Sequence, residues 1–310
     1  MPVIATKNTA VLVQGITGSE GSFRTKRMLE YGTRIVAGCT PGKGGQFVHG
    51  VPVFDTVAEA KDEHSEINTV VQLVPAIFAR DATLEAIETE IPYIVVIAEG
   101  IPFQDVMEMT SAAREKGLTI IGPNTAGVIS PGICELGATA QCVFHGPGKI
   151  GVISCTGSIQ WYLTRLISLR GWGQSTFVDV GGDPIRGIDY DEVLLMFQND
   201  PHTEAVLWIG EIGGDPEIRA AKLIKDGSVT KPLVAYIYGR TAPPGRTLGH
   251  AGAIIERGRG DVKSKVEALR RAGATVITYP WEVVGAFEHL GLESIPELLK
   301  KPIKEAAVGR

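Results

Sequence analysis

The sequence lacks the cysteine spacing of a metal site or a disulfide scaffold. Its four cysteines, Cys39, Cys134, Cys142 and Cys155, form no CxxC pair, and its six histidines are scattered along the chain. Structural zinc sites and disulfide frameworks are recognised by close, repeated spacing of such residues. We therefore expect no metal held by this chain, and a reducing compartment.

The sequence also lacks a large excess of charge of one sign, and it lacks a long apolar run. The 310 residues carry 30 basic and 35 acidic side chains, interspersed, for a net charge of -5. A nucleic-acid partner is not expected, because it would need a basic surface. The first residues lack the basic start and apolar stretch of a signal peptide, and no run approaches the roughly 18 apolar residues that span a bilayer. We expect a cytoplasmic protein with no membrane partner.

Short, almost wholly apolar runs alternate with helical patterns through the first part of the chain. Such runs are typical of parallel strands covered on both faces, and the 38 glycines suit tight turns between strands and helices. We predict an α/β fold whose residues 1–125 form a doubly wound, Rossmann-like domain with its ligand crevice at the carboxyl ends of the strands. The predicted strands are Ala10–Gln14, Arg34–Cys39, Thr69–Val74, Tyr93–Ala98 and Leu118–Gly122, and the predicted helices are Phe23–Tyr31, Ile77–Glu88 and Phe103–Lys116.

Residues 126–148 interrupt this alternation, because glycine, proline and small polar residues dominate without a strong period. Such a composition predicts an interdomain linker. The alternation then returns and predicts a second doubly wound, flavodoxin-like domain at residues 149–310, with a charged, peripheral tail from Glu293. Its predicted strands are Ile150–Ser154, Gln174–Val180, Ala205–Gly210, Leu233–Tyr238 and Thr275–Thr278, and its predicted helices are Ser158–Arg170, Asp189–Asn199, Glu217–Lys225, Val262–Ala272 and Pro280–Leu290.

The turn after the first strand, Gly15 to Gly21, has the position of a phosphate-binding loop, between a strand and a helix. The hydroxyls of Thr17 and Ser19 can join backbone N–H groups around Gly18 on a phosphate. Its spacing is GxxGxxG, whereas dinucleotide-binding dehydrogenases use GxGxxG, so a nicotinamide enzyme is disfavoured. The alternative is that these glycines only permit a tight turn.

Three more strand ends face the same crevice. Lys43 lies in a glycine-rich loop and can neutralise a second phosphate, which favours a ligand with several phosphates, such as coenzyme A. Val74 and Pro75 follow the next strand. Glu99 follows another, and it either accepts a hydrogen bond from an adenine or amide group or is a solvated acid.

The second domain has three comparable strand ends. Ser154, Thr156 and Gly157 open a helix and predict a phosphate site, with an ordinary serine N-cap as the alternative. Cys155 lies among them, with no histidine near it in sequence to support a nucleophilic role. The glycine pair Gly181-Gly182 can offer backbone N–H groups to a substrate carboxylate.

Glu211 and His250 are the candidate catalytic pair. Glu211 can hold an imidazole by a hydrogen bond, or it can be an acid that complements a helix N-terminus. His250 lies among Gly249, Ala251 and Gly252, which leave it room to reach a reacting group. Histidine can attack a phosphoryl or acyl centre near neutral pH, although a lone loop histidine is more often unremarkable.

Five segments, in order along the chain, together resemble the α subunit of succinyl-CoA synthetase: Thr40–Gly45, Gly122–Thr125, Gly181–Pro184, Gly210–Gly214 and Gly249–Ala253. The resemblance implies that His250 is phosphorylated, that Glu211 supports it, and that the helix start at Ser154, Thr156 and Gly157 holds its phosphate. It also implies that coenzyme A is bound by Thr17, Gly18, Ser19, Lys43, Val74, Pro75 and Glu99.

The resemblance further implies an ATP-grasp β subunit, in an αβ or α2β2 assembly, that binds ATP or GTP with Mg²⁺. A small carboxylic acid would take the phosphoryl group as an acyl phosphate, from which the thiol of coenzyme A displaces phosphate. The chain departs from the succinate pattern at Cys155, in place of an arginine, and at Ala126, in place of a proline. Malate, citrate or a sulfonated acid therefore stay open as substrates, and a CoA-binding regulatory protein without ligase activity is the alternative of another class.

Overall fold

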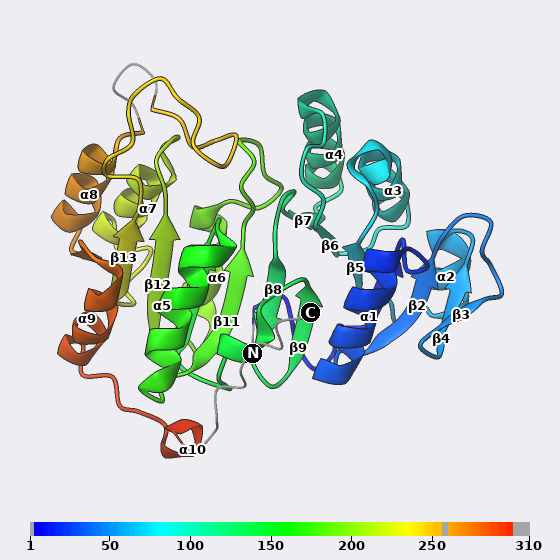
Figure 1. Cartoon of the computed structure of the whole chain (residues 1–310), viewed down its shortest axis with the longest axis horizontal. Coiled ribbons are helices and arrows are strands. Elements are labelled where there is room, and N and C mark those ends of the chain that lie inside the picture. The colour runs from blue at the N-terminus through cyan, green and yellow to red at the C-terminus, as the bar shows by residue number, and fades with distance from the viewer. Residues whose placement is uncertain (1–2, 256–259, 300–310) are drawn as a thin grey trace.

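The computed structural model describes residues 3–255 and 260–299. They form two sheets of seven strands each, which lie side by side with helices over them (Figure 1). Within this part of the chain, no helix is both long enough and apolar enough to cross a bilayer. The prediction of an α/β fold with two doubly wound sheets is confirmed.

The first sheet has the strand order β3-β4-β2-β1-β5-β6-β7, and all its pairs except β3–β4 are parallel. The chain runs outward from β1 in both directions, so the ligand crevice expected for such sheets lies between β1 and β5. The sequence analysis missed β3, β4 and α2, because two to seven residues are too few to show a period. The strands are β1 (Val11–Gln14), β2 (Ile35–Cys39), β3 (Phe47–Val48), β4 (Val51–Phe54), β5 (Thr69–Gln72), β6 (Tyr93–Val96) and β7 (Thr119–Ile121), and the helices are α1 (Ser19–Tyr31), α2 (Val57–Glu63), α3 (Ala76–Glu88) and α4 (Phe103–Glu115).

The second sheet has the order β14-β13-β12-β10-β11-β8-β9. Its five parallel strands follow the flavodoxin order, and the chain reverses direction across the sheet between β10 and β12. The strands are β8 (Gly127–Ser130), β9 (Cys134–Gly137), β10 (Ile150–Ser154), β11 (Gln174–Asp179), β12 (Ala205–Gly210), β13 (Leu233–Ile237) and β14 (Thr275–Ile277). The helices are α5 (Gly157–Leu169), α6 (Tyr190–Asn199), α7 (Pro216–Lys225), α8 (Val262–Arg271), α9 (Val283–His289) and α10 (Pro296–Leu299), with 3-10 turns η1 (Gln141–Val143) and η2 (Pro280–Glu282).

The predicted linker over residues 126–148 is instead part of the second sheet. Strands β8 and β9 form an antiparallel hairpin, and β8 pairs with β11. All residues of both strands are buried. The interpretation as a linker was wrong because four-residue strands that are covered on both faces show neither alternation nor a helical period.

The β8–β9 hairpin also fastens the two sheets together. The hydroxyl of Thr33, just after α1, donates to the carbonyl of Glu135 at 2.8 Å and accepts the N–H of the same residue at 3.0 Å. Met28 of α1 and Leu136 of β9 belong to one apolar cluster that continues into the second sheet. The two halves of the chain therefore share a continuous core at this hairpin.

The described part of the C-terminal tail is packed, whereas the sequence predicted a peripheral segment. The N–H of Ile295 donates to the carbonyl of Gly171 at 2.7 Å, and Leu298 of α10 is buried. The Leu298 side chain packs against Gly173, just before β11, where a Cβ would lie 2.5 Å from its Cδ1. Residues 300–310 of the predicted tail lie outside the described residues.

A buried lysine of α8 holds the loop that follows β12. The ammonium of Lys265 donates to the carbonyls of Glu211, at 2.7 Å, and Gly213, at 2.5 Å. It also lies 2.6 Å from a carboxylate oxygen of Glu217 in α7, and both side chains are almost fully buried. Burial raises the pKa of Glu217, and the neighbouring ammonium opposes that shift. The loop after β12 is thus pinned to two helices.

We expect Lys265→Ala to lower the free energy of unfolding by about 3–5 kcal/mol, because it leaves the Glu217 carboxylate buried without its partner. Lys263→Ala is the matched control, since Lys263 is exposed on the same helix, and it should change stability by less than about 0.5 kcal/mol. Urea unfolding followed by circular dichroism measures both. Equal stability of the two variants would contradict the role assigned to Lys265.

Candidate active site

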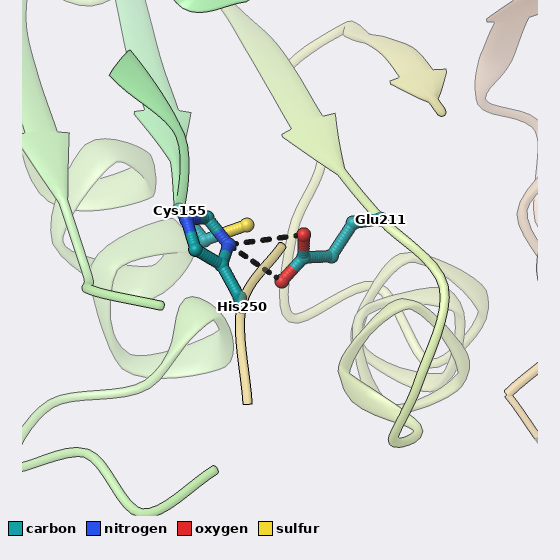
Figure 2. A group of neighbouring side chains, drawn as sticks. All are labelled: Cys155, Glu211 and His250. Carbon is teal, nitrogen blue, oxygen red and sulfur yellow. Dashed lines mark hydrogen bonds and ion pairs between the residues drawn. The ribbon is translucent and has the colours of Figure 1, made fainter. Parts of the chain in front are cut away.

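The candidate site lies at the carboxyl edge of the second sheet, where the strand order reverses. Strands β10 and β12 are parallel neighbours, so Cys155 and Glu211, which follow them, emerge side by side. His250 reaches the same place from the long segment between β13 and α8 (Figure 2). Ligands of open α/β sheets bind at such reversal points. The predicted pair of His250 and Glu211 is therefore brought together at the position where a site is expected.

The imidazole of His250 is held through one of its two nitrogens. Its Nδ1 lies 3.1 Å from each carboxylate oxygen of Glu211. This hydrogen bond raises the pKa of His250, while partial burial acts in the opposite direction. With Nδ1–H donating to the carboxylate, the neutral ring carries its lone pair on Nε2. The His250 side chain is 25% exposed and that of Glu211 only 9%, so the acid is fixed and the imidazole is accessible.

Two polar residues at neighbouring strand ends complete this arrangement, and the sequence analysis missed both. The Tyr238 hydroxyl, after β13, donates to Oε2 of Glu211 at 2.5 Å. Asp179, at the end of β11, accepts the N–H groups of Ala126 and Gly181 at 2.8 and 3.0 Å. Burial raises the pKa of Asp179 to about 6, against the influence of nearby His250. The available signal was a polar residue directly after two apolar or aromatic residues at a strand end, Phe177-Val178 before Asp179 and Tyr236-Ile237 before Tyr238.

The glycine pair Gly181-Gly182 makes room for the imidazole. A Cβ on Gly182 would lie 2.6 Å from Cδ2 of His250, closer than any side chain allows. The N–H of Gly181 donates to Asp179, and that of Gly182 donates to the carbonyl of Asn124 at 3.0 Å. The prediction that these N–H groups face a substrate carboxylate is therefore not supported, because both are engaged within the protein.

The predicted phosphate site at the start of α5 is open, but Ser154 has a different part in it. The buried Ser154 hydroxyl accepts the N–H of Thr156 at 3.0 Å and donates to the carbonyl of the same residue at 2.9 Å. It shapes the turn and is not the helix cap. The N-cap residue, Thr156, makes no side-chain cap, and Gly157 is exposed. The uncapped N–H groups of the first turn can receive an anion.

The residues expected to bind coenzyme A all lie at the carboxyl edge of the first sheet. Gly18 is the N-cap of α1 and adds no side-chain cap to the helix start. Lys43 is exposed, and its loop is held by the N–H of Gly44, which donates to Asp55 at 2.8 Å. An open helix start with a cation at the neighbouring strand end fits a ligand that carries several phosphates. The remaining members of the set are half-buried or exposed at the same edge: Thr17, Ser19, Val74, Pro75 and Glu99.

Cys155 lies beside the candidate catalytic pair, although nothing near it in sequence indicated a partner. Its sulfur, a nitrogen of His250 and a carboxylate oxygen of Glu211 all lie within 4.8 Å of one another. Burial, followed by the nearby Glu211 carboxylate, raises the pKa of the thiol well above 9.0. Because the thiolate is the reactive form, a buried thiol of this kind is a poor nucleophile.

Two family models match the chain in the order of its two sheets. The model described as a CoA binding domain matches residues 6–100, and the model described as CoA-ligase matches residues 153–275. The first match covers the turn after β1 and the loops that follow β2, β5 and β6. The second covers Glu211 and His250.

Curated relatives match nearly the whole chain. The α subunit 2 of an ADP-forming succinate–CoA ligase from Archaeoglobus fulgidus is 50% identical and covers 91% of this chain and 97% of its own. The α subunit of the enzyme from Methanothermobacter thermautotrophicus is 48% identical, over 91% of this chain and 94% of its own. An ADP-forming sulfoacetate–CoA ligase subunit from an Acholeplasma species is 44% identical, over 94% of this chain and 99% of its own.

Solved structures agree with this relationship. A mutant ATP citrate lyase from Methanosaeta concilii, in complex with (3S)-citryl-CoA, superposes with a TM-score of 0.85 at 26% identity. The match covers 99% of this chain but 53% of the lyase chain, so this chain spans about half the length of that relative. The similarity of sequence, fold and domain order leads to one conclusion: the chain belongs to the family of succinate–CoA ligase α subunits.

Proposed function

We propose that this chain is the α subunit of a nucleoside-triphosphate-dependent carboxylate–CoA ligase, and that it carries a phosphoryl group on Nε2 of His250. The observation that supports this most directly is the orientation of the imidazole. Its Nδ1 is bound by Glu211, and Nε2 makes no hydrogen bond to any described residue, at the edge of the sheet where ligands bind. A histidine whose one nitrogen is held by a carboxylate presents the other as the nucleophile.

In the first step of the proposed reaction, Nε2 of His250 attacks the terminal phosphorus of ATP or GTP. A bond from Nε2 to phosphorus forms as the bond to the leaving nucleoside diphosphate breaks. The ring becomes positively charged, and the Glu211 carboxylate stabilises that charge through Nδ1–H. Tyr238 keeps Glu211 in place. We assign the nucleotide and its Mg²⁺, which neutralises phosphate charge, to an ATP-grasp β subunit.

In the next steps the phosphoryl group moves from His250 to the acid, and the acyl group then moves to coenzyme A. The uncapped start of α5 stabilises the phosphate beside His250. An oxygen of the substrate carboxylate attacks phosphorus and frees Nε2, and the thiol of coenzyme A attacks the acyl carbon and releases phosphate. We propose that coenzyme A is held at the first sheet by Thr17, Gly18, Ser19, Lys43, Val74, Pro75 and Glu99.

Labelling tests the phosphoryl carrier. Incubation of the complex of this chain and its β subunit with [γ-³²P]ATP should place acid-labile, base-stable phosphate on this chain, and His250→Asn should abolish it. His202→Asn is the matched control, because His202 is exposed on a turn before β12 and should leave labelling unchanged. Label that persists in His250→Asn would show that another residue carries the phosphoryl group.

Glu211→Gln tests the supporting carboxylate. Because Glu211 raises the pKa of His250, the variant should lower it, and the rate of His250 phosphorylation should fall by about 10- to 100-fold. The stabilisation from this contact is fully present below the ordinary histidine pKa of 6.5 and is lost as pH rises through the raised value. NMR titration of the imidazole protons and urea unfolding across pH measure the two effects. Tyr238→Phe keeps the carboxylate and should not lower the pKa of His250.

The substrate is proposed to be a small dicarboxylate, with succinate first. Relatives named for succinate and for sulfoacetate are 50% and 44% identical, so overall identity does not choose between acids. In a panel of succinate, malate, citrate and sulfoacetate, assayed by loss of free thiol with the β subunit present, succinate should give the highest kcat/KM by about 10-fold or more. A higher value for another acid would reassign the substrate and keep the chemistry.

A CoA-binding regulatory protein is the competing proposal from another class. It predicts that coenzyme A binds while no acid in the panel is turned over. The contact between Glu211 and His250 favours the ligase, because a protein that only binds coenzyme A has no need to orient an imidazole at the second sheet.

A further inference from the structure

Three different metal-binding groups meet at the candidate active site. The Cys155 sulfur, a Glu211 carboxylate oxygen and a His250 ring nitrogen lie within 4.8 Å of one another. Figure 2 shows the sulfur and the carboxylate on the side of the imidazole that carries Nδ1. Within residues 3–255 and 260–299 no other group of histidine, cysteine and acidic residues comes together in this way.

This set of donors matches zinc in chemistry and in size. Thiolate, imidazole and carboxylate are the three protein ligands of Zn²⁺, and three of them leave a fourth position for water. Metal–ligand bonds of 2.0–2.3 Å in a tetrahedral site put neighbouring donor atoms about 3.6 Å apart. Nδ1 of His250 and the Glu211 oxygens, which lie 3.1 Å apart, therefore need to separate by about 0.5 Å, and the Cys155 sulfur needs to move toward them by at most about 1 Å.

The surroundings of the cluster allow that movement and give the ion a way in. His250 follows Gly249, which has φ 79° and no atom within 4 Å of the position of a Cβ. The His250 side chain is 25% exposed, whereas Cys155 and Glu211 are buried. An ion can thus reach the cluster from the face where His250 meets solvent.

We propose that Cys155, Glu211 and His250 form an inhibitory site for a soft divalent cation, with Zn²⁺ as the ion of this class. On binding, the proton of the Cys155 thiol passes to water, His250 gives up its Nδ1 proton and takes one from water on Nε2 so that the ring stays neutral, and Glu211 exchanges its hydrogen bond for a bond to the metal. The thiolate and the carboxylate balance the two charges of the ion. No oxidation or reduction takes place.

Metal binding would oppose phosphorylation of His250 in two ways. The ion withdraws electron density from the imidazole, and Glu211 can no longer stabilise the positive charge that phosphorylation creates. This inhibitory consequence rests on the proposed function, whereas metal binding itself does not. Cys155 makes the site selective for a soft cation, because such a cation prefers sulfur to oxygen ligands.

Cobalt(II) added to the full chain, reduced with a phosphine, tests the binding. We expect one Co²⁺ per chain with the absorption band of a thiolate–cobalt bond, displaced by one equivalent of Zn²⁺. Cys155→Ser and Cys155→Ala should lose the band, and Cys142→Ser should keep it, since Cys142 lies at η1 outside the cluster. Absence of the band from the wild-type chain, or its persistence in both Cys155 variants, would overturn the proposal.

A second measurement tests the inhibition in the complex with the β subunit. At fixed MgATP, micromolar Zn²⁺ should slow phosphorylation of His250 in the wild type, and Cys155→Ser should need about 10- to 100-fold more Zn²⁺ for the same effect. Equal sensitivity of the two proteins would reject the inhibitory role. If His250 is never phosphorylated, the proposed function fails while the cobalt band still reports the metal site, so the two failures are distinguishable.

Discussion

The hydrogen bond between Glu211 and Nδ1 of His250 is the contact around which the carboxyl edge of the second sheet is arranged. It requires the end of β12 and a residue some forty positions later to be held within 3.1 Å. Tyr238 fixes the carboxylate from the neighbouring strand, and Lys265 fixes the backbone behind it from α8. A residue after the neighbouring strand and a residue of α8 thereby hold the carboxylate that positions the His250 imidazole. Because the imidazole is held through Nδ1, its Nε2 keeps a lone pair that no described residue engages.

The glycines around the site mainly leave room for neighbouring groups. A Cβ on Gly182 would meet the His250 ring at 2.6 Å, and a Cβ on Gly213 would lie 1.9 Å from the carbonyl oxygen of Gly252. The long segment that carries His250 can lie close to two strand-end loops only because those positions have no side chain. The N–H groups of Gly181 and Gly182 are used within the protein, so the uncapped helix start at Gly157 is the part of this edge that can receive an anion.

The connection between the two sheets takes part in the site. The carbonyl of Asn124, which follows β7, accepts the N–H of Gly182 behind the His250 ring. Strand β9 meanwhile packs under α1 and shares its apolar cluster. A displacement of the first sheet would therefore move the backbone that lies behind the His250 imidazole. This continuity suits the proposed reaction, in which coenzyme A bound at the first sheet must meet an acyl phosphate formed at the second.

The local pattern of the sequence was sufficient for the long strands and helices, for the two doubly wound sheets, and for His250, Glu211 and the open helix starts as candidates. Those features depend on residues close together in the chain, such as apolar runs that end at glycines. The β8–β9 hairpin, the roles of Asp179, Tyr238 and Lys265, and the place of Cys155 depended on the tertiary structure. Their partners come from distant segments, because β10, β11, β12 and β13 are neighbours only after the sheet forms. Strand order, which no local pattern encodes, decided which side chains meet His250.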